Sequence, residues 1–90
     1  MTIHNPEYDA NPICQEFEKV YRQAGIMWAD RPRLGGKTQQ EESDASLRKE
    51  IDSTIEAAKR LRDATLDEQG LRVDEHWGQR DFEVHLVPLE

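Results

Sequence analysis

Residues 43–69, SDASLRKEIDSTIEAAKRLRDATLDEQ, decide the fold of this chain. At about 100° per residue, their apolar side chains fall within one broad sector, and most of the charged side chains lie outside it. The interior contains no Gly or Pro and is rich in good helix formers. We therefore predict a long amphipathic helix on which the other elements pack. Its apolar stripe consists of Leu47, Ile51, Thr54, Ile55, Ala58, Leu61, Thr65 and Leu66.

The end of this helix is better specified than its start. Gly70 can adopt the left-handed conformation that follows the last helical turn. At the other end, a capping box beginning at Thr38 competes with later caps at Ser43 or Ser46. Residues 38–46 offer almost nothing apolar to bury. We therefore expect the packed helix to begin near Ser43.

After Gly70 the apolar period changes from 3.6 to 2, which is typical of β-strands. Two alternating segments, residues 71–77 and 82–87, flank the four-residue loop 78–81 and predict an antiparallel hairpin. A shift of one residue would move every side chain to the other face, so the apolar match selects the register. On the inner face it pairs Trp77 with Phe82 and Val73 with Leu86, and on the outer face His76 with Glu83 and Asp74 with His85.

The first forty residues show weaker signals. Residues 1–10 have little periodicity, and we expect a mobile arm there. Asn11-Pro12 then opens a helix, which Gly25 can end. Residues 26–29 fit either a short third strand or one more helical turn. Residues 30–42, DRPRLGGKTQQEE, have one large apolar side chain and predict a flexible linker.

These elements predict an α+β fold, with an N-terminal helix, a flexible linker, a long amphipathic helix and a C-terminal antiparallel hairpin packed on the helices. The hairpin needs that packing because two strands alone are marginally stable. Residues 11–90 are expected to form a single small domain. Leu, Ile, Val and Phe make up only 18 of the 90 residues, so the core must be thin or shared with a partner.

Charge and cysteine content narrow the classes of function. The net charge is −7, and residues 41–90 carry all of it. A general nucleic-acid binder needs a cationic face, so direct nucleic-acid binding is not expected. Cys14 stands alone, and the sequence shows neither a leader pattern nor a membrane-spanning stretch. These features favour a reduced, cytoplasmic setting.

One group of side chains could carry chemistry. The predicted register gathers His76, His85, Asp74 and Glu83 on the outer face of the hairpin, and imidazoles with carboxylates can hold a metal or transfer protons. Opposite charges also stabilise an exposed strand face as cross-strand pairs, and we favour that interpretation. No catalytic residues, cofactor or metal are therefore assigned.

The leading hypothesis is a small acidic interaction or regulatory protein without catalysis, which binds another protein or itself. A thin core can leave large aromatic side chains on the surface as interface anchors, although all of them could equally be core. One alternative is a metal-binding or small hydrolytic domain that uses the outer face of the hairpin. Another is an acidic mimic that binds a nucleic-acid-binding protein. The candidate interaction residues are Trp28, Ile51, Ile55, Leu61, Trp77 and Phe82.

Overall fold

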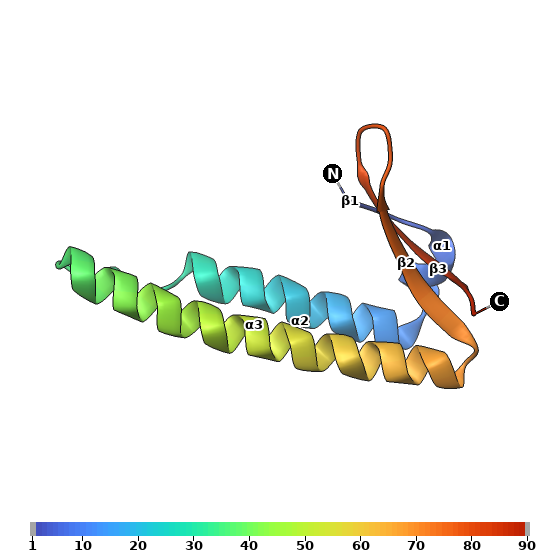
Figure 1. Ribbon diagram of the computed structural model, residues 1–90, viewed down its shortest axis with the longest axis horizontal. Coiled ribbons are helices and arrows are strands. Elements are labelled where there is room, and N and C mark those ends of the chain that lie inside the picture. Colours follow the sequence, from blue (N-terminus) through green and yellow to red (C-terminus); the bar gives the residue numbers. More distant parts are fainter. Residues whose placement is uncertain (1, 90) are drawn as a thin grey trace.

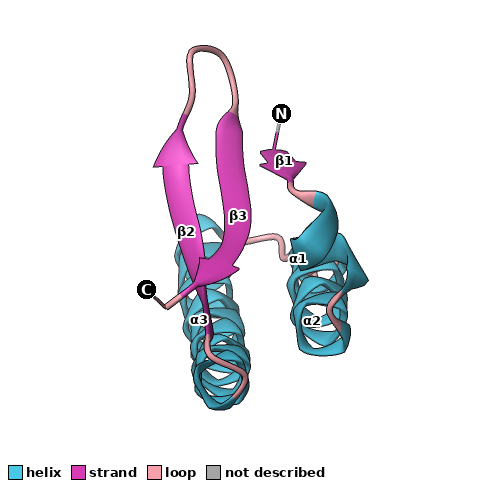
Figure 2. Cartoon of the chain, turned by 90° about the vertical axis from the view of Figure 1, so that its right-hand side faces the viewer, coloured by secondary structure: helices cyan, strands magenta, loops and turns pink. Residues whose placement is uncertain are grey.

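The computed structural model describes residues 2–89 and shows an α+β fold, as the sequence predicts. Helices α2 and α3 run side by side in opposite directions, and a three-stranded sheet stands over one end of the pair (Figures 1 and 2). The elements in chain order are β1 Thr2–His4, α1 Pro6–Ala10, α2 Pro12–Ala29, α3 Lys37–Glu68, β2 Leu71–Trp77 and β3 Phe82–Pro88.

The long helix is present, but it begins earlier than expected. α3 starts at Lys37, with Gly36 as an N-cap that supplies no side-chain hydrogen bond. The end lies where the sequence places it, because Gly70 has a φ of +76° and is followed directly by β2. The early start has a local cause: residues 37–42 are mostly helix formers, and they need little burial when they only extend an existing helix.

The predicted linker is correspondingly shorter than residues 30–42 and is tied to α3. Only residues 30–36 connect the two helices. Arg31 donates to Asp44 over 3.1 Å, and Gln40 donates to the carbonyl of Pro32 over 3.1 Å. The side-chain oxygen of Gln40 also accepts from the backbone of Leu34. Polar side chains of the first α3 turns therefore replace the apolar contacts that this segment lacks.

α2 continues through Gly25 to Ala29, so the interpretation of residues 26–29 as a further helical turn is correct and the third strand is not there. A glycine inside a helix costs only about 1 kcal/mol, which packing against α3 offsets. The third strand is instead β1, at the start of the chain.

Residues 2–10, where the sequence predicts a mobile arm, contain this strand and α1; residue 1 itself lies outside the described residues. β1 pairs in parallel with β3, which places Thr2 opposite Phe82 and His4 opposite Val84. Asn5 then joins three elements. Its Oδ1 accepts from the backbone N–H of Tyr8 and of Leu86, and its Nδ2 donates to the Leu86 carbonyl.

The hairpin register is confirmed. Trp77 lies opposite Phe82, Val73 opposite Leu86, and both outer-face pairs are also as predicted. The strand order β1-β3-β2 makes β3 the central strand. Tyr8, Cys14 and Leu66 are the most deeply buried side chains and form the core with Val84 and Leu86. The core therefore lies between the sheet, α1 and the adjoining end of the helix pair.

The buried side of α3 points in a slightly different direction from the predicted apolar stripe. The interleaved charged residues of this helix predict a solvated face that includes Arg62, yet Arg62 is 2% exposed, whereas Leu61 of the predicted stripe is 62% exposed. The buried positions Ile51, Arg62 and Leu66 share a direction from which Leu61 is rotated by roughly 100°. An arginine can occupy such a position because its long apolar stem packs like a hydrophobic side chain.

Candidate functional site

An aromatic-lined cleft of about 340 Å³ lies between the inner face of the sheet and the helix pair. The hairpin leaves the end of α3 at Gly70 and rises away from both helices (Figure 1). Concave apolar surfaces with a few convergent polar groups are the usual form of a binding site. Side chains that line the cleft include Phe17 and Tyr21 of α2, Ile55 and Arg62 of α3, and Phe82 and Val84 of β3.

The floor of the cleft contains a buried phenol. Tyr8 is 1% exposed, and its hydroxyl donates a 2.7 Å hydrogen bond to Glu18. His4 stacks on the Tyr8 ring at 4.6 Å and has its Nε2 3.8 Å from the same Glu18 carboxylate. Burial, reinforced by Glu18, raises the pKa of the Tyr8 hydroxyl far above its usual value. Tyr8 therefore stays protonated and acts as a hydrogen-bond donor, not as a base.

Arg62 forms the second polar group of the floor. Its Nε and Nη2 each lie 3.0 Å from Asp63, and its Nη2 lies 3.9 Å from Glu75. Its guanidinium also stacks over the Phe17 ring at 4.4 Å. Within residues 2–89, every buried side-chain nitrogen or oxygen has a hydrogen-bond partner. The buried charge is thus compensated and fixes the rings that line the cleft.

Trp77 extends this aromatic surface beyond the cleft. It is 77% exposed, and its ring centroid lies 5.2 Å from that of Phe82 on the same face of the sheet. The tip of the hairpin projects past the helices (Figure 1). Tyr21, on the opposite wall, is 57% exposed. Aromatic side chains therefore stand on both sides of the opening.

The structure gathers some of the candidate interaction residues and separates others. Ile55 and Phe82 line the cleft, and Trp77 adjoins it. Ile51 is a core residue, and Leu61 is exposed elsewhere on α3. Trp28 lies towards the other end of the helix pair, where Arg31 and Arg48 approach its ring to 4.3 and 5.1 Å.

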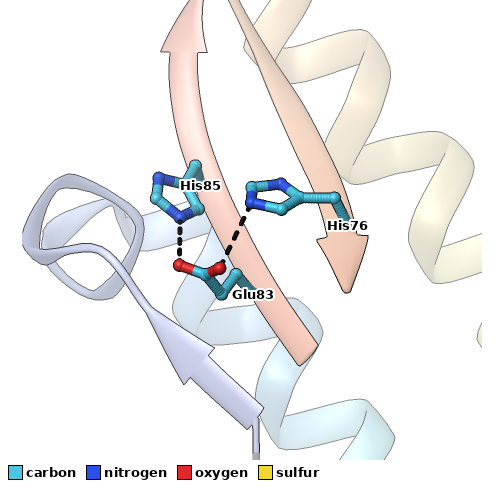
Figure 3. A group of neighbouring side chains, drawn as sticks. All are labelled: His76, Glu83 and His85. Carbon is cyan, nitrogen blue, oxygen red and sulfur yellow. Dashed lines mark hydrogen bonds and ion pairs between the residues drawn. The ribbon is translucent and has the colours of Figure 1, made fainter. Parts of the chain in front are cut away.

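The outer face of the hairpin holds the predicted group of histidines and carboxylates. Nε2 of His76 lies 3.3 Å from Glu83 Oε2, and Nε2 of His85 lies 3.4 Å from Glu83 Oε1 (Figure 3). Asp74 is paired with His85 in the backbone register, but its carboxylate faces Nδ1 of His76 at 3.8 Å. Three of the four predicted side chains therefore converge, and Asp74 stands behind one of them.

Sequence reasoning missed the polar residues of the cleft floor. Tyr8 lies in the expected arm, and Arg62 is among the charged residues expected on the solvated face of its helix. A usable signal existed for Tyr8: Asn5-Pro6 repeats the cap that identifies the start of α2 at Asn11-Pro12. A signal also existed for Arg62, because at about 100° per residue it falls between Ile51 and Leu66, inside the apolar sector of the helix.

Comparisons with known proteins give no family to which the chain can be assigned. No protein-family model, curated protein or solved structure matched it. Among the described residues, no helix combines the length and the apolar character needed to cross a membrane.

Proposed function

We propose that this chain is a small interaction module without catalysis, which binds another protein through the cleft and the adjoining Trp77. The observation that carries the proposal is the position of Trp77, a large aromatic side chain that is 77% exposed beside an aromatic-lined cleft. Tryptophan and tyrosine dominate the binding energy of many protein interfaces. Covering an exposed tryptophan with a partner removes a large apolar surface from water, which contributes favourable free energy to binding.

The chemistry of the buried titratable groups also favours binding over catalysis. Burial raises the pKa of the Cys14 thiol, and the residue is fully buried, so the reactive thiolate is disfavoured. The Tyr8 hydroxyl is held protonated, and the Arg62 guanidinium is already paired. These groups are suited to holding the shape of a surface.

The matching partner presents an apolar or aromatic side chain that enters the cleft between Tyr21 and Phe82 and packs against Trp77. Lys59 and Glu75 also line the cleft and carry opposite charges. The polar contribution to recognition is therefore of mixed sign, and the apolar contacts supply most of the affinity.

Site-specific photocross-linking in the cells that produce the protein tests this proposal. A photoreactive residue replaces Gln79, in the exposed loop beside Trp77, or Glu41, at the opposite end of the molecule (Figure 1). We expect one discrete protein adduct from position 79 and none from position 41. An adduct with a second copy of this chain would identify self-association, which light scattering of the purified protein would also detect.

The affinity for the identified protein then decides whether the aromatic surface is responsible. Trp77→Ala should weaken binding by at least about 30-fold, which corresponds to the 2 kcal/mol of an interface hot spot. Leu61→Ala is the matched control because Leu61 is also apolar and is 62% exposed on α3 outside the cleft lining. Equal effects of the two substitutions, or no discrete adduct from position 79, would refute the proposed surface.

A further inference from the structure

We infer that the outer face of the hairpin is a zinc-binding site formed by His76, Glu83 and His85, a function separate from the proposed protein interaction. One ligand atom from each of these residues can be chosen so that all three atoms lie within 4.8 Å of one another. Among the described residues, this is the group of histidine, cysteine and carboxylate side chains that meets such a criterion. The three side chains point towards a common centre (Figure 3).

The hairpin register produces this convergence. His76 and Glu83 are directly opposite each other on β2 and β3, and His85 follows Glu83 by two residues on the same face. The two imidazole rings lie 5.2 Å apart, with the Glu83 carboxylate reaching both Nε2 atoms. Gly78 leaves room for this carboxylate, because a Cβ at that position would collide with it.

The two contacts to Glu83 are longer than charge-assisted hydrogen bonds and leave room between the three side chains. Charge-assisted N–H···O bonds are about 2.7–2.9 Å long, whereas the two contacts to Glu83 are 3.3 and 3.4 Å. Tetrahedral zinc, with bonds of about 2.0–2.1 Å, separates neighbouring ligand atoms by about 3.3–3.4 Å. The two contacts reach different oxygens of Glu83, and one ligand atom from each of the three residues lies within 4.8 Å of the others. The remaining separation closes by side-chain rotation, for which the partial exposure of all three residues leaves space.

The donor set selects the class of metal. Two imidazole nitrogens and one carboxylate suit zinc, whereas calcium and magnesium prefer sites composed of oxygen ligands. Three protein ligands leave a fourth position, which faces solvent and is filled by water. The arrangement around His76 supports the same assignment: Asp74 approaches its Nδ1 while its Nε2 faces Glu83. A carboxylate on the far nitrogen is the usual way in which proteins orient a histidine ligand.

Isothermal titration with zinc chloride, followed in parallel by NMR of the histidine rings, tests the site on the full chain. We expect saturable binding of one zinc ion per chain and none of calcium. The ring signals of His76 and His85 should shift, whereas those of His4, outside the group, should stay in place as an internal control. Binding that does not saturate, or zinc-induced shifts confined to His4, would overturn the inference.

Substitutions assign the ligands. His76→Ala, His85→Ala and Glu83→Gln should each weaken zinc binding by at least about 10-fold, the lower end of the loss seen even for residues that only orient a ligand. Glu41→Gln makes the same change of charge at the far end of α3 and should leave binding unchanged. Unchanged affinity in all three hairpin variants would refute the site. Adding cobalt(II) in place of zinc to the unmodified protein avoids any effect of a substitution on folding. Intense visible absorption bands of four-coordinate cobalt would support the site, and the weak absorption of hydrated cobalt would contradict it.

Discussion

Replacing Asn5 by alanine removes a junction on which three elements depend. The side chain makes three hydrogen bonds, one to the backbone of Tyr8 at 3.0 Å and two to the backbone of Leu86 at 3.0 and 3.1 Å. A typical hydrogen bond contributes about 0.5–1.5 kcal/mol to stability, and a lost N-cap costs about 1 kcal/mol. We therefore expect Asn5→Ala to lower the free energy of unfolding by about 2–4 kcal/mol.

The protein should tolerate this loss and remain measurable. A domain of this length has a stability of roughly 5–13 kcal/mol at about 0.05–0.15 kcal/mol per residue. Urea denaturation followed by circular dichroism gives the free energy of unfolding by linear extrapolation. Asn5→Asp is an informative intermediate, because the carboxylate keeps the acceptor for Tyr8 and Leu86 but loses the donor to the Leu86 carbonyl.

Asn11 provides the matched control. Its side chain caps α2 by accepting from the backbone N–H of Ile13 at 3.1 Å, and the other hydrogen bond of this side chain is an exposed contact with Gln69. Asn11→Ala should therefore cost only about 1 kcal/mol. Equal losses for the two alanine variants would show that the bonds to Leu86 contribute nothing, and the proposed role of Asn5 as a junction would be wrong.

Two further predictions concern the helix α3 and the buried phenol. Leu66→Ala should destabilise the protein by about 2–5 kcal/mol because Leu66 is fully buried. Leu61→Ala should change the stability by less than about 0.5 kcal/mol, because Leu61 is exposed. Comparable losses of stability for the two variants in urea denaturation would contradict the buried direction of α3 described above. Burial and Glu18 raise the pKa of Tyr8 in the folded state. The contribution of Tyr8 to the free energy of unfolding is therefore fully present below its pKa in the unfolded chain, about 10, and is lost as the pH rises towards its pKa in the folded state. Thermal denaturation above pH 10 should therefore show a steeper loss of stability for the unmodified protein than for Tyr8→Phe, and parallel pH profiles would contradict this assignment.

Local chemistry accounts for the parts of the fold that the sequence predicts correctly. The hairpin register follows from strand periodicity, because any slip would turn Val84 and Leu86 to the solvent. Gly70 is equally well determined, since its positive φ is a conformation that few other residues adopt. The convergence of His76, Glu83 and His85 is a consequence of that same register.

The parts that were missed depend on contacts between distant segments. Nothing within residues 1–10 shows that β1 has a partner, because that partner is β3 at the other end of the described chain. The burial of Arg62 likewise requires Asp63, Glu75 and the Phe17 ring, which three different elements supply. The cleft could not be predicted either, because the angle at which the hairpin leaves α3 is a tertiary feature.

The position of β3 in the middle of the sheet has a consequence for how the chain is assembled. Synthesis proceeds from the N-terminus, so the central strand is the last of the three to emerge from the ribosome. Helices α2 and α3 are contiguous and can pair early, but Thr2 must wait for Phe82, which follows 80 residues later. Until then the core around Tyr8 lacks Val84 and Leu86, and β1 presents an unpaired edge. An unpaired strand edge exposed during synthesis is a place at which nascent chains can associate.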